Sequence, residues 1–582
     1  MDTRQTQAME AMVVSVKITT RPPNPECESR LQQNGIHVLL ARLWAARGVA
    51  TPEQTRQTWA DLINPAELSQ ADRAAAILAD AISARQKLLV IADYDCDGAT
   101  ACAVALRGLR AFGADVDFLV PNRFETGYGL SPAVVDLASR HHAGKPDLLI
   151  TVDNGIASID GVQAANELGM KVLVTDHHLP GDTLPDAVAI VNPNHPDCGF
   201  PSKNLAGVGV IFYVLLALRA EFRRRGWVEP KGGPRLDALA DLVALGTVAD
   251  VVRLDANNRL LVSQGLKKIR SNQLHAGIKA LFLVSSCDNR QATALDLGFR
   301  IGPRINAAGR LADMSIGIRC LTTDDEAEAL ALARELDTIN HRRRTIEQDM
   351  SEQAHASLEA PGKARSATVC VFHPEWHQGV VGIVASRLKE KFWKPTLAFA
   401  PGDPGQLRGS GRSVPDVHLR DVLDLVSKTH SGMILKFGGH AMAAGLTLRE
   451  EAFAEFEEAF DLAVRRISGK DSFEPLIETD GSLDPLYATP EVASMLQEHV
   501  WGAGFPPPLF RDTFRVVSQR LLKEKHLKLR LERTNQHYDA IWFNHAEAVP
   551  EYIDLVYEIT PNAWNGVVNV QLMVRHAEPA AF

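Results

Sequence analysis

The sequence predicts an α/β protein built on a doubly wound parallel sheet, followed by a second, smaller α/β domain and a small β-barrel. Three observations lead to this prediction. Short apolar runs alternate with helical stretches over residues 87–194, which is typical of a parallel sheet with helices on both faces. The alternation restarts after Ser366, and after Asp471 short strands follow one another. A chain of 582 residues is also too long for one compact core.

Five strands are expected in the first sheet, at residues 88–91, 116–120, 148–152, 172–174 and 187–191. Each is a short apolar run, as strands buried on both faces require. Helix-like segments such as 100–112 and 159–168 lie between several of them, and residues 236–270 add helical sequence rich in Leu, Ala and Val. We assign residues 1–320 to this first domain.

A long helix is expected over residues 324–357, within a connecting segment that we place at 321–360. Apolar residues recur in it at helical spacing, and one arginine fills the gap in the series: Leu332, Leu336, Ile339, Arg343, Ile346 and Met350. The polar face carries Arg342, Arg344 and Glu347. The pattern fits a helix packed along one domain as well as one that joins two.

The second α/β domain is placed at residues 361–470. It is expected to contain a strand at 368–372, a helix at 379–391 and a strand at 396–400, with glycine-rich turns at 400–411 and at Gly438-Gly439. Residues 471–582 are expected to form an OB-like barrel with strands at 514–517, 527–531, 540–543 and 567–574. Asn565-Gly566 is typical of a tight hairpin turn.

Composition limits the function classes without choosing one. The net charge of −9 gives no electrostatic sign of nucleic-acid binding, although basic residues can still line a groove. Seven scattered cysteines without a Cys-x-x-Cys favour reduced thiols and argue against disulfides or a structural zinc site. No stretch is long and apolar enough to span a bilayer, and no signal peptide is recognisable. We therefore expect a cytoplasmic protein, without membrane contact, and a monomer.

Acidic and imidazole side chains follow three of the expected strands. The first strand runs into Asp93-Tyr94-Asp95-Cys96-Asp97-Gly98, the third into Asp153-Asn154-Gly155, and the fourth into Asp176-His177-His178. The carboxyl ends of parallel strands share one edge of the sheet, where ligands bind. Buried acids this close together need a cation. The sequence therefore predicts a metal site at this edge.

A further acid, Asp250, follows an apolar helix that ends in Gly-Thr-Val-Ala. Its carboxylate either joins the same edge or points away from it. Oxygen ligands with one or two imidazoles suit Mn²⁺ or Mg²⁺ better than Zn²⁺, and an acid able to bridge suggests two ions. Such a site is suited to hydrolysis of phosphoesters.

Other interpretations of these motifs are weaker. The first block resembles the start of a calcium loop, but its twelfth position is Val104 instead of Glu. Asp153 alone fits an Asx turn. His141-His142 follows no strand, and we assign it no function. Gly207-Val208-Gly209 lacks the third glycine of a dinucleotide loop, so helix packing explains it better.

The four blocks, ending with Gly246-Thr247-Val248-Ala249-Asp250, resemble the DHH phosphoesterase superfamily. Within it, further segments are similar to the RecJ exonucleases. These are Pro121-Asn122-Arg123, Gly127-Tyr128-Gly129, Arg304-Ile305-Asn306-Ala307-Ala308-Gly309-Arg310, His377-Gln378-Gly379-Val380-Val381-Gly382, Gly409-Ser410-Gly411-Arg412 and Gly438-Gly439-His440. The resemblance covers residues 40–575.

The resemblance implies a role for each site residue. The metal ligands would be Asp95, Asp97, Asp153, His177 and Asp250, with Asp153 as the bridge. His178 would act on the phosphate or the leaving oxygen, with Asp93 and Asp176 in support. The DNA and its 5′-phosphate would contact Arg123, Arg304, Asn306, Arg310, Gln378, Ser410, Arg412 and His440. For each arginine, a salt bridge within the protein is the alternative.

The resemblance further implies a single-stranded-DNA-specific 5′ to 3′ exonuclease of DNA recombination and repair that releases 5′-mononucleotides. The strand would run between the two α/β lobes and along the OB-like domain. Single-stranded-DNA-binding protein and other repair proteins would be partners. Two alternatives remain: a phosphodiesterase of short oligonucleotides or cyclic dinucleotides, and a non-catalytic DNA-binding scaffold. Residues 471–582 argue against the first, and the intact acid and histidine set argues against the second.

Overall fold

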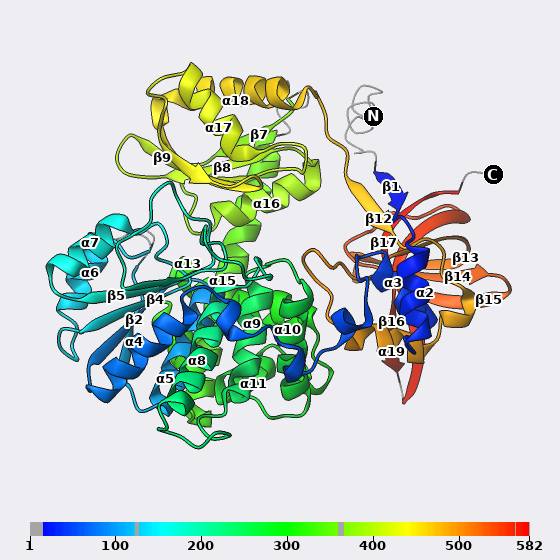
Figure 1. Cartoon of the computed structure of the whole chain (residues 1–582). Coiled ribbons are helices and arrows are strands. Elements are labelled where there is room, and N and C mark those ends of the chain that lie inside the picture. Colours follow the sequence, from blue (N-terminus) through cyan, green and yellow to red (C-terminus); the bar gives the residue numbers. More distant parts are fainter. Residues whose placement is uncertain (1–15, 123–126, 128, 359–365, 565, 581–582) are drawn as a thin grey trace. The chain divides into compact units, whose positions relative to one another are not determined.

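The computed structural model describes residues 16–122, 127, 129–358, 366–564 and 566–580. The chain divides into two compact units. Figure 1 shows their helices and strands, coloured along the sequence. One comprises Thr20–Ile339 and Thr479–Phe582, and the other Asn340–Glu478 with the N-terminal residues up to Thr19. No helix among the described residues is both long and apolar enough to cross a membrane.

The first unit contains a five-stranded sheet in which all strands are parallel. The strands are β2 (Lys87–Ala92), β3 (Asp115–Leu119), β4 (Leu148–Val152), β5 (Lys171–Thr175) and β6 (Ala189–Val191). Their order is β3-β2-β4-β5-β6. The chain reverses direction across the sheet between β2 and β4, and ligands bind beside such a switch point at the carboxyl ends of the strands.

The two faces of this sheet bury two separate cores. Successive side chains of a strand point to opposite faces. Leu88 and Val90 of β2 enter one core, and Leu89 and Ile91 enter the other. The first face packs against α4 (Ala71–Ser83), α5 (Cys96–Ala111) and α8 (Gly207–Arg224), and the second against α6 (Pro132–Ser139) and α7 (Ile159–Glu167). The predicted doubly wound α/β class is confirmed.

Helices complete this part of the unit. They are α9 (Ala240–Ala249), α10 (Ala256–Arg270), α11 (Ala276–Val284), α12 (Ala294–Asp296), α13 (Gly302–Leu311) and α14 (Ser315–Thr322). Two N-terminal helices, α2 (Pro25–Gln33) and α3 (Val38–Ala45), precede the sheet. Just after α3, Arg47 pairs with Asp480 at 2.8 Å, so the N-terminal helices are tied to the sequence that leads into the barrel.

The predicted long helix is α15 (Glu326–Leu358). Leu332, Leu336 and Met350 are buried as expected. Arg343 does occupy the gap in the apolar series: it is buried, pairs with Glu347 at 2.6 Å and donates to Asn340 Oδ1 at 2.7 Å. Glu347 was expected on the exposed face, but its side chain is largely buried because it pairs with Arg343 and with Arg387. A buried guanidinium such as that of Arg343 needs a counter-charge.

The second unit contains a sheet of order β10-β11-β9-β8-β7. Only β7 and β8 pair in parallel. Its elements are β7 (Val369–Phe372), α16 (Val381–Phe392), β8 (Thr396–Pro401), β9 (Gln406–Arg412), α17 (Leu419–Thr429), β10 (Ile434–Gly439), β11 (Ala443–Arg449) and α18 (Phe453–Ser468). The two glycine-rich segments expected as turns include strands β9 and β10. A Cβ at Gly411 would meet Leu397 and Leu419 at 2.6–2.7 Å, so glycine lets those side chains close over the strand.

The C-terminal strands form a closed barrel of order β13-β14-β15-β17-β16, as the OB-like prediction required. They are β13 (Phe510–Leu522), β14 (His526–Arg533), β15 (Gln536–Trp542), β16 (Tyr552–Trp564) and β17 (Val567–Pro579), after α19 (Pro490–Glu498). Trp564 pairs with Val567, so a two-residue loop joins β16 and β17. Asn565 lies outside the described residues, and Gly566 has φ +79°. Strands β1 (Lys17–Thr20) and β12 (Leu476–Thr479) pair separately.

Candidate metal centre

The first acidic block links the end of β2 to the start of α5. Asp95 is the N-cap of α5, and its side chain accepts a hydrogen bond from the Gly98 amide at 3.0 Å. Asp97 lies in the first turn and is 1% exposed. Glycine is needed at position 98 because a Cβ there would lie 2.6 Å from the Asp93 carbonyl oxygen. The motif therefore folds back tightly enough to bring three carboxylates together.

Asp97 is held by the N-terminus of another helix. Its two carboxylate oxygens accept hydrogen bonds from the amides of Gly207 and Val208, at 2.6 and 2.9 Å. These amides belong to the first turn of α8, where free N–H groups favour negative charge. A Cβ at Gly207 would lie 2.6 Å from Asp153 Cβ. Gly207 thus lets Asp153 lie close to the start of α8 and donates its amide to Asp97. The sequence analysis had explained this glycine by helix packing alone.

Asp153 follows β4 in a left-handed backbone conformation, with φ +63°. This conformation is strained for a residue with a side chain, and such residues cluster at functional sites. The next residue, Asn154, donates to the carbonyls of Ile91 and Val152, at 3.1 and 2.9 Å. It therefore joins the ends of β2 and β4 across the switch point, and Asp153 projects from that junction with 1% exposure.

Asp176 organises the third block. Its Oδ1 accepts from the amides of His177 and His178, at 2.7 and 3.1 Å, and lies 2.7 Å from His178 Nδ1. Its Oδ2 accepts from the Ile156 amide at 2.9 Å. Burial alone would raise the pKa of Asp176, but the hydrogen bond and charge of His178 hold it below its usual value. Asp176 is thus a carboxylate that fixes both histidines.

The two histidines differ in electrostatics. Burial opposes protonation of His178, but the hydrogen bond to Asp176 and the charge of Asp176 outweigh it and raise the pKa of His178 to about 9. Burial, followed by the charge of His178, lowers the pKa of His177 to about 4. At neutral pH His178 is therefore a cation and His177 a neutral ring, which is the form that binds metals.

His177 faces the carboxylates. Its Nε2 lies 3.1 Å from Asp153 Oδ1 and 3.5 Å from Asp250 Oδ2. Asp250 is the C-cap of α9, so the structure settles the open question of its direction in favour of this site. Three groups of side chains, linked through Asp153 and His177, have ligand atoms within 4.8 Å of one another: Asp93, Asp95 and Asp153; Asp153, His177 and His178; and Asp97, His177 and Asp250.

The acids of this cluster resist ionisation. Burial, and then the charges of the neighbouring acids, raise the pKa of Asp93, Asp97 and Asp153 well above the usual value. Burial and then Asp95 raise the pKa of Asp250 to about 7. A cation would reverse this cost by stabilising the ionised carboxylates. Hard oxygen donors and one neutral imidazole fit Mn²⁺ or Mg²⁺.

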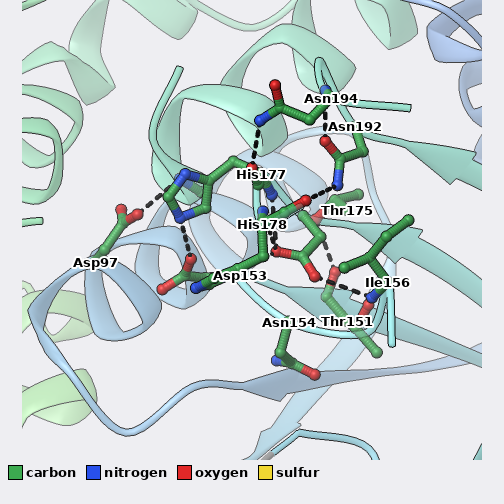
Figure 2. A network of polar contacts seen from close by, with 12 residues as sticks. Asp97, Thr151, Asp153, Asn154, Ile156, Thr175, His177, His178, Asn192 and Asn194 are labelled. Carbon is green, nitrogen blue, oxygen red and sulfur yellow. Dashed lines mark hydrogen bonds and ion pairs between the residues drawn. The ribbon is translucent and has the colours of Figure 1, made fainter. Parts of the chain in front are cut away.

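Two asparagines that the sequence analysis did not single out hold the histidine block. Asn192 donates to the His178 carbonyl at 2.9 Å, and Asn194 donates to the His177 carbonyl at 2.7 Å (Figure 2). Both follow β6, the next strand of the sheet. Their position directly after an expected strand was the one signal in the sequence that could have indicated them.

The predicted DNA contacts of α13 lie against the first acidic block. Asn306 accepts from the Cys96 amide at 2.7 Å, between Asp95 and Asp97. Arg304 is 6% exposed and pairs with Asp337 at 2.9 Å, which is the alternative we considered for the arginines. Arg310 is half-buried in the same helix. That these residues contact DNA stays a prediction.

The remaining predicted contacts lie in the second unit, except Arg123, which lies outside the described residues. Arg412 donates to Ser410 Oγ at 3.2 Å and to the Gly411 carbonyl at 2.7 Å. Gln378 accepts from Arg408 at 3.2 Å, and His440 is exposed in the β10–β11 turn. A Cβ at Gly382, in the first turn of α16, would lie 2.9 Å from Ser410 Oγ and 3.2 Å from Arg412 Nη2.

Three family models match the chain. The model of the DHH family, N-terminal domain, matches residues 87–247, the DHHA1 domain matches 365–466, and the RecJ OB domain matches 479–576. The single-stranded-DNA-specific exonuclease RecJ of Escherichia coli (strain K12) is 46% identical over 93% of this chain and 96% of its own length. The chain belongs to the RecJ family.

Further RecJ proteins extend this similarity. RecJ of Haemophilus influenzae is 44% identical over 93% of this chain and 96% of its own length. The crystal structure of Thermus thermophilus RecJ with Mn²⁺ has a TM-score of 0.80 at 29% identity and covers 97% of this chain and 80% of that one. The Mg²⁺ complex of the same RecJ has a TM-score of 0.76 at 28% identity, with 97% and 78% covered. Both metals named in these RecJ structures are those that the donor set here fits.

Proposed function

We propose that this chain is a metal-dependent exonuclease that degrades single-stranded DNA from 5′ to 3′ and releases 5′-mononucleotides. The observation that carries the proposal is the buried cluster of carboxylates and one neutral imidazole at the ends of β2, β4 and β5. Together with membership of the RecJ family, this cluster supports hydrolysis of phosphodiesters by two Mn²⁺ or Mg²⁺ ions. When bound, the ions would supply a Lewis acid and lower the pKa of water.

The chain's own residues hold and complete this site. The ligands would be Asp95, Asp97, Asp153, His177 and Asp250, with Asp153 as the bridging acid. The His178 cation is 37% exposed at its side chain, so it can donate a hydrogen bond to a phosphate oxygen or a proton to the leaving oxygen. Asp176 keeps His178 protonated and oriented. Asp93 completes the acidic cluster beside Asp95.

In the second unit, Arg412 supports recognition of the terminal 5′-phosphate. Burial lowers the pKa of its guanidinium. Among the described residues no carboxylate lies within ion-pair distance of it. A half-buried guanidinium without an acidic partner favours a bound anion, and a phosphate accepts its paired hydrogen bonds well. Gly382, at the start of α16, lets Ser410 Oγ and the Arg412 guanidinium come close to that helix.

The remaining proposals concern the setting of this activity. We propose that Arg304, Asn306, Arg310, Gln378, His440 and Arg123 lie along the DNA path, and that residues 471–582 extend it as an OB-like domain. Single-stranded-DNA-binding protein and other recombination and repair proteins are the proposed partners, in the cytoplasm, with this chain as a monomer. The proposed domain bounds are 1–320, 321–360, 361–470 and 471–582.

The activity is tested with end-labelled single strands, duplexes and dinucleotides in Mn²⁺, and then in EDTA. We expect stepwise release of mononucleotides from the 5′ end of single strands, none from duplex, and none in EDTA. Asp153→Ala should abolish hydrolysis, and Asp160→Ala, a control in an exposed acid of α7, should not. Faster cleavage of dinucleotides than of long strands would instead favour a short-oligonucleotide phosphodiesterase, and binding without cleavage would favour a scaffold.

The phosphate pocket gives a sharper prediction. A 5′-phosphorylated strand should have a kcat/KM at least about tenfold above that of a 5′-hydroxyl strand, because each charge-assisted contact contributes about 1.5–3 kcal/mol. Arg412→Ala should remove most of this preference and change cleavage of the 5′-hydroxyl strand much less. The measurement is kcat/KM for both proteins on both strands. If Arg412→Ala lowers kcat/KM for both strands by the same factor, Arg412 is a general contact to the DNA backbone and not part of a phosphate pocket.

A further inference from the structure

A second cluster of metal-ligating side chains lies on the parallel sheet away from the proposed catalytic centre. It consists of Asp117 on β3 and of His141 and His142 in the turn after α6. Their ligand atoms lie within 4.8 Å of one another. Asp117 pairs in register with Leu89 of β2, which lies four residues before Asp93 in the sequence. At about 3.3 Å per residue, the two clusters are separated by about 13 Å along the strand.

The geometry of this cluster is close to that of a coordinated ion. His142 Nε2 lies 3.3 Å from Asp117 Oδ2, and His141 Nε2 lies 3.9 Å from the same oxygen. In a tetrahedral zinc site with ligand bonds of about 2.0–2.1 Å, neighbouring ligand atoms are about 3.3–3.4 Å apart. One pair already matches this spacing, and the distance in the other pair is about 0.5 Å longer.

The surroundings hold these ligands in place. Asp117 Oδ1 accepts from the Phe118 amide at 2.9 Å, which leaves Oδ2 facing the imidazoles. The turn is anchored because Lys87 Nζ donates to the Ala143 carbonyl at 2.7 Å and the Gly144 amide donates to the His141 carbonyl at 2.8 Å. The Ala143 amide donates weakly to His141 Nδ1, at 3.4 Å. When His141 binds a metal through Nε2, its ring proton lies on Nδ1, which can then no longer accept this hydrogen bond. The loss of the hydrogen bond costs about 1 kcal/mol.

We propose that Asp117, His141 and His142 form a separate site for a divalent transition-metal ion of the Zn²⁺ type. Two imidazoles and one carboxylate prefer such an ion to Mn²⁺ or Mg²⁺, which favour oxygen. His141 is 8% exposed and His142 is 80% exposed, so the site opens to solvent on one side and leaves room for water as a further ligand. The bound ion braces β3, the edge strand of the sheet, against the turn between α6 and β4.

The site is tested by titrating Zn²⁺ calorimetrically into the full chain and three variants. Asp117→Asn keeps the acceptor for the Phe118 amide and removes the charge, and His142→Ala removes an exposed ring. Asp115→Asn is the matched control, since it makes the same change two residues earlier on the same strand, at an exposed position. Exonuclease activity in Mn²⁺ and thermal unfolding with and without Zn²⁺ are measured on the same proteins.

We expect the wild type and Asp115→Asn to bind one more Zn²⁺ per chain than Asp117→Asn and His142→Ala, and to gain more thermal stability from Zn²⁺. Activity in Mn²⁺ should stay within about twofold in all four proteins, since none of the changed residues belongs to the catalytic cluster. Equal Zn²⁺ stoichiometry in all four would overturn the site. A loss of activity that accompanies the loss of Zn²⁺ would overturn its independence from the catalytic centre.

Discussion

At the scale of single residues, neighbouring histidines of one motif have opposite electrostatics. His178 shares a hydrogen bond with Asp176, and its pKa is raised to about 9. His177 turns toward Asp153 and Asp250 instead, and burial lowers its pKa to about 4. The sequence shows two identical side chains, and the different partners of the two rings leave one protonated and the other neutral.

This difference predicts separate effects of substitution. His178→Ala should keep metal affinity and DNA binding but lower kcat by on the order of a hundredfold or more, because a cation that acts on the phosphate is lost. His177→Ala should weaken metal binding itself. Calorimetric titration of Mn²⁺ into both variants, with DNA binding measured in parallel, separates the two. Equal Mn²⁺ affinities in the two variants would contradict the division of roles.

At the scale of elements, α13 acts as a support for the first acidic block. Asn306 holds the Cys96 amide, and Gly309 of the same helix lies so close to Tyr94 that a Cβ would overlap its carbonyl oxygen. The helix therefore contacts the turn that carries Asp95 and Asp97 through its backbone as well as through a side chain. This packing explains why the motif of α13 has Asn at position 306 and Gly at position 309.

This packing predicts that Gly309→Ala should disturb the metal centre without touching a ligand. The added methyl group must displace either α13 or the acidic turn, so Mn²⁺ affinity and kcat should both fall, by about tenfold or more. Gly317→Ala in α14 is the matched control, because its Cβ would meet only side-chain atoms of Ile305 and Met314 at 3.2 Å. An Mn²⁺ affinity in Gly309→Ala equal to that of Gly317→Ala would show that the turn does not depend on this contact.

At the scale of the whole molecule, distant segments of the chain meet around His499. Its ring packs edge-on against the ring of Trp44 in α3, with 4.9 Å between the ring centroids. His499 directly follows α19, the helix that precedes the barrel. Burial, and then the charge of Arg270 at the end of α10, lower the pKa of His499 to about 4. Parts of the fold separated by hundreds of residues therefore share one histidine that must stay neutral.

A histidine with a lowered pKa in the folded state makes stability depend on pH. Between about pH 4 and 6.5 the unfolded chain binds more protons than the folded one, so this contribution is complete above 6.5 and is lost as the pH falls toward 4. At pH 5 the loss is on the order of 2 kcal/mol. His499→Phe should therefore flatten the fall in stability between pH 6.5 and 5, measured by urea unfolding. His537→Phe, at an exposed histidine of β15, should keep the wild-type dependence of stability on pH. If His499→Phe also keeps the wild-type dependence, His499 does not contribute to the loss of stability at low pH.

The sequence alone determined the order of the strands along the chain and the edge at which the acids meet. Both follow from local patterns: apolar runs mark buried strands, and the carboxyl ends of parallel strands share an edge. This reasoning was sufficient to bring Asp93, Asp153 and His177 together before any coordinates. It did not decide where Asp250 points, because a residue at the end of a helix depends on how that helix packs.

Only the tertiary structure decided which groups hold these side chains. The amides that bind Asp97 lie 110 and 111 residues away, and Asn306 lies 210 residues from Cys96. It also placed Arg304 in an ion pair and brought Asp117 to His141-His142, a pair to which the sequence assigned no function. Such contacts leave no periodic signal, because their free energy depends on distances between elements and not on the spacing of residues within one element.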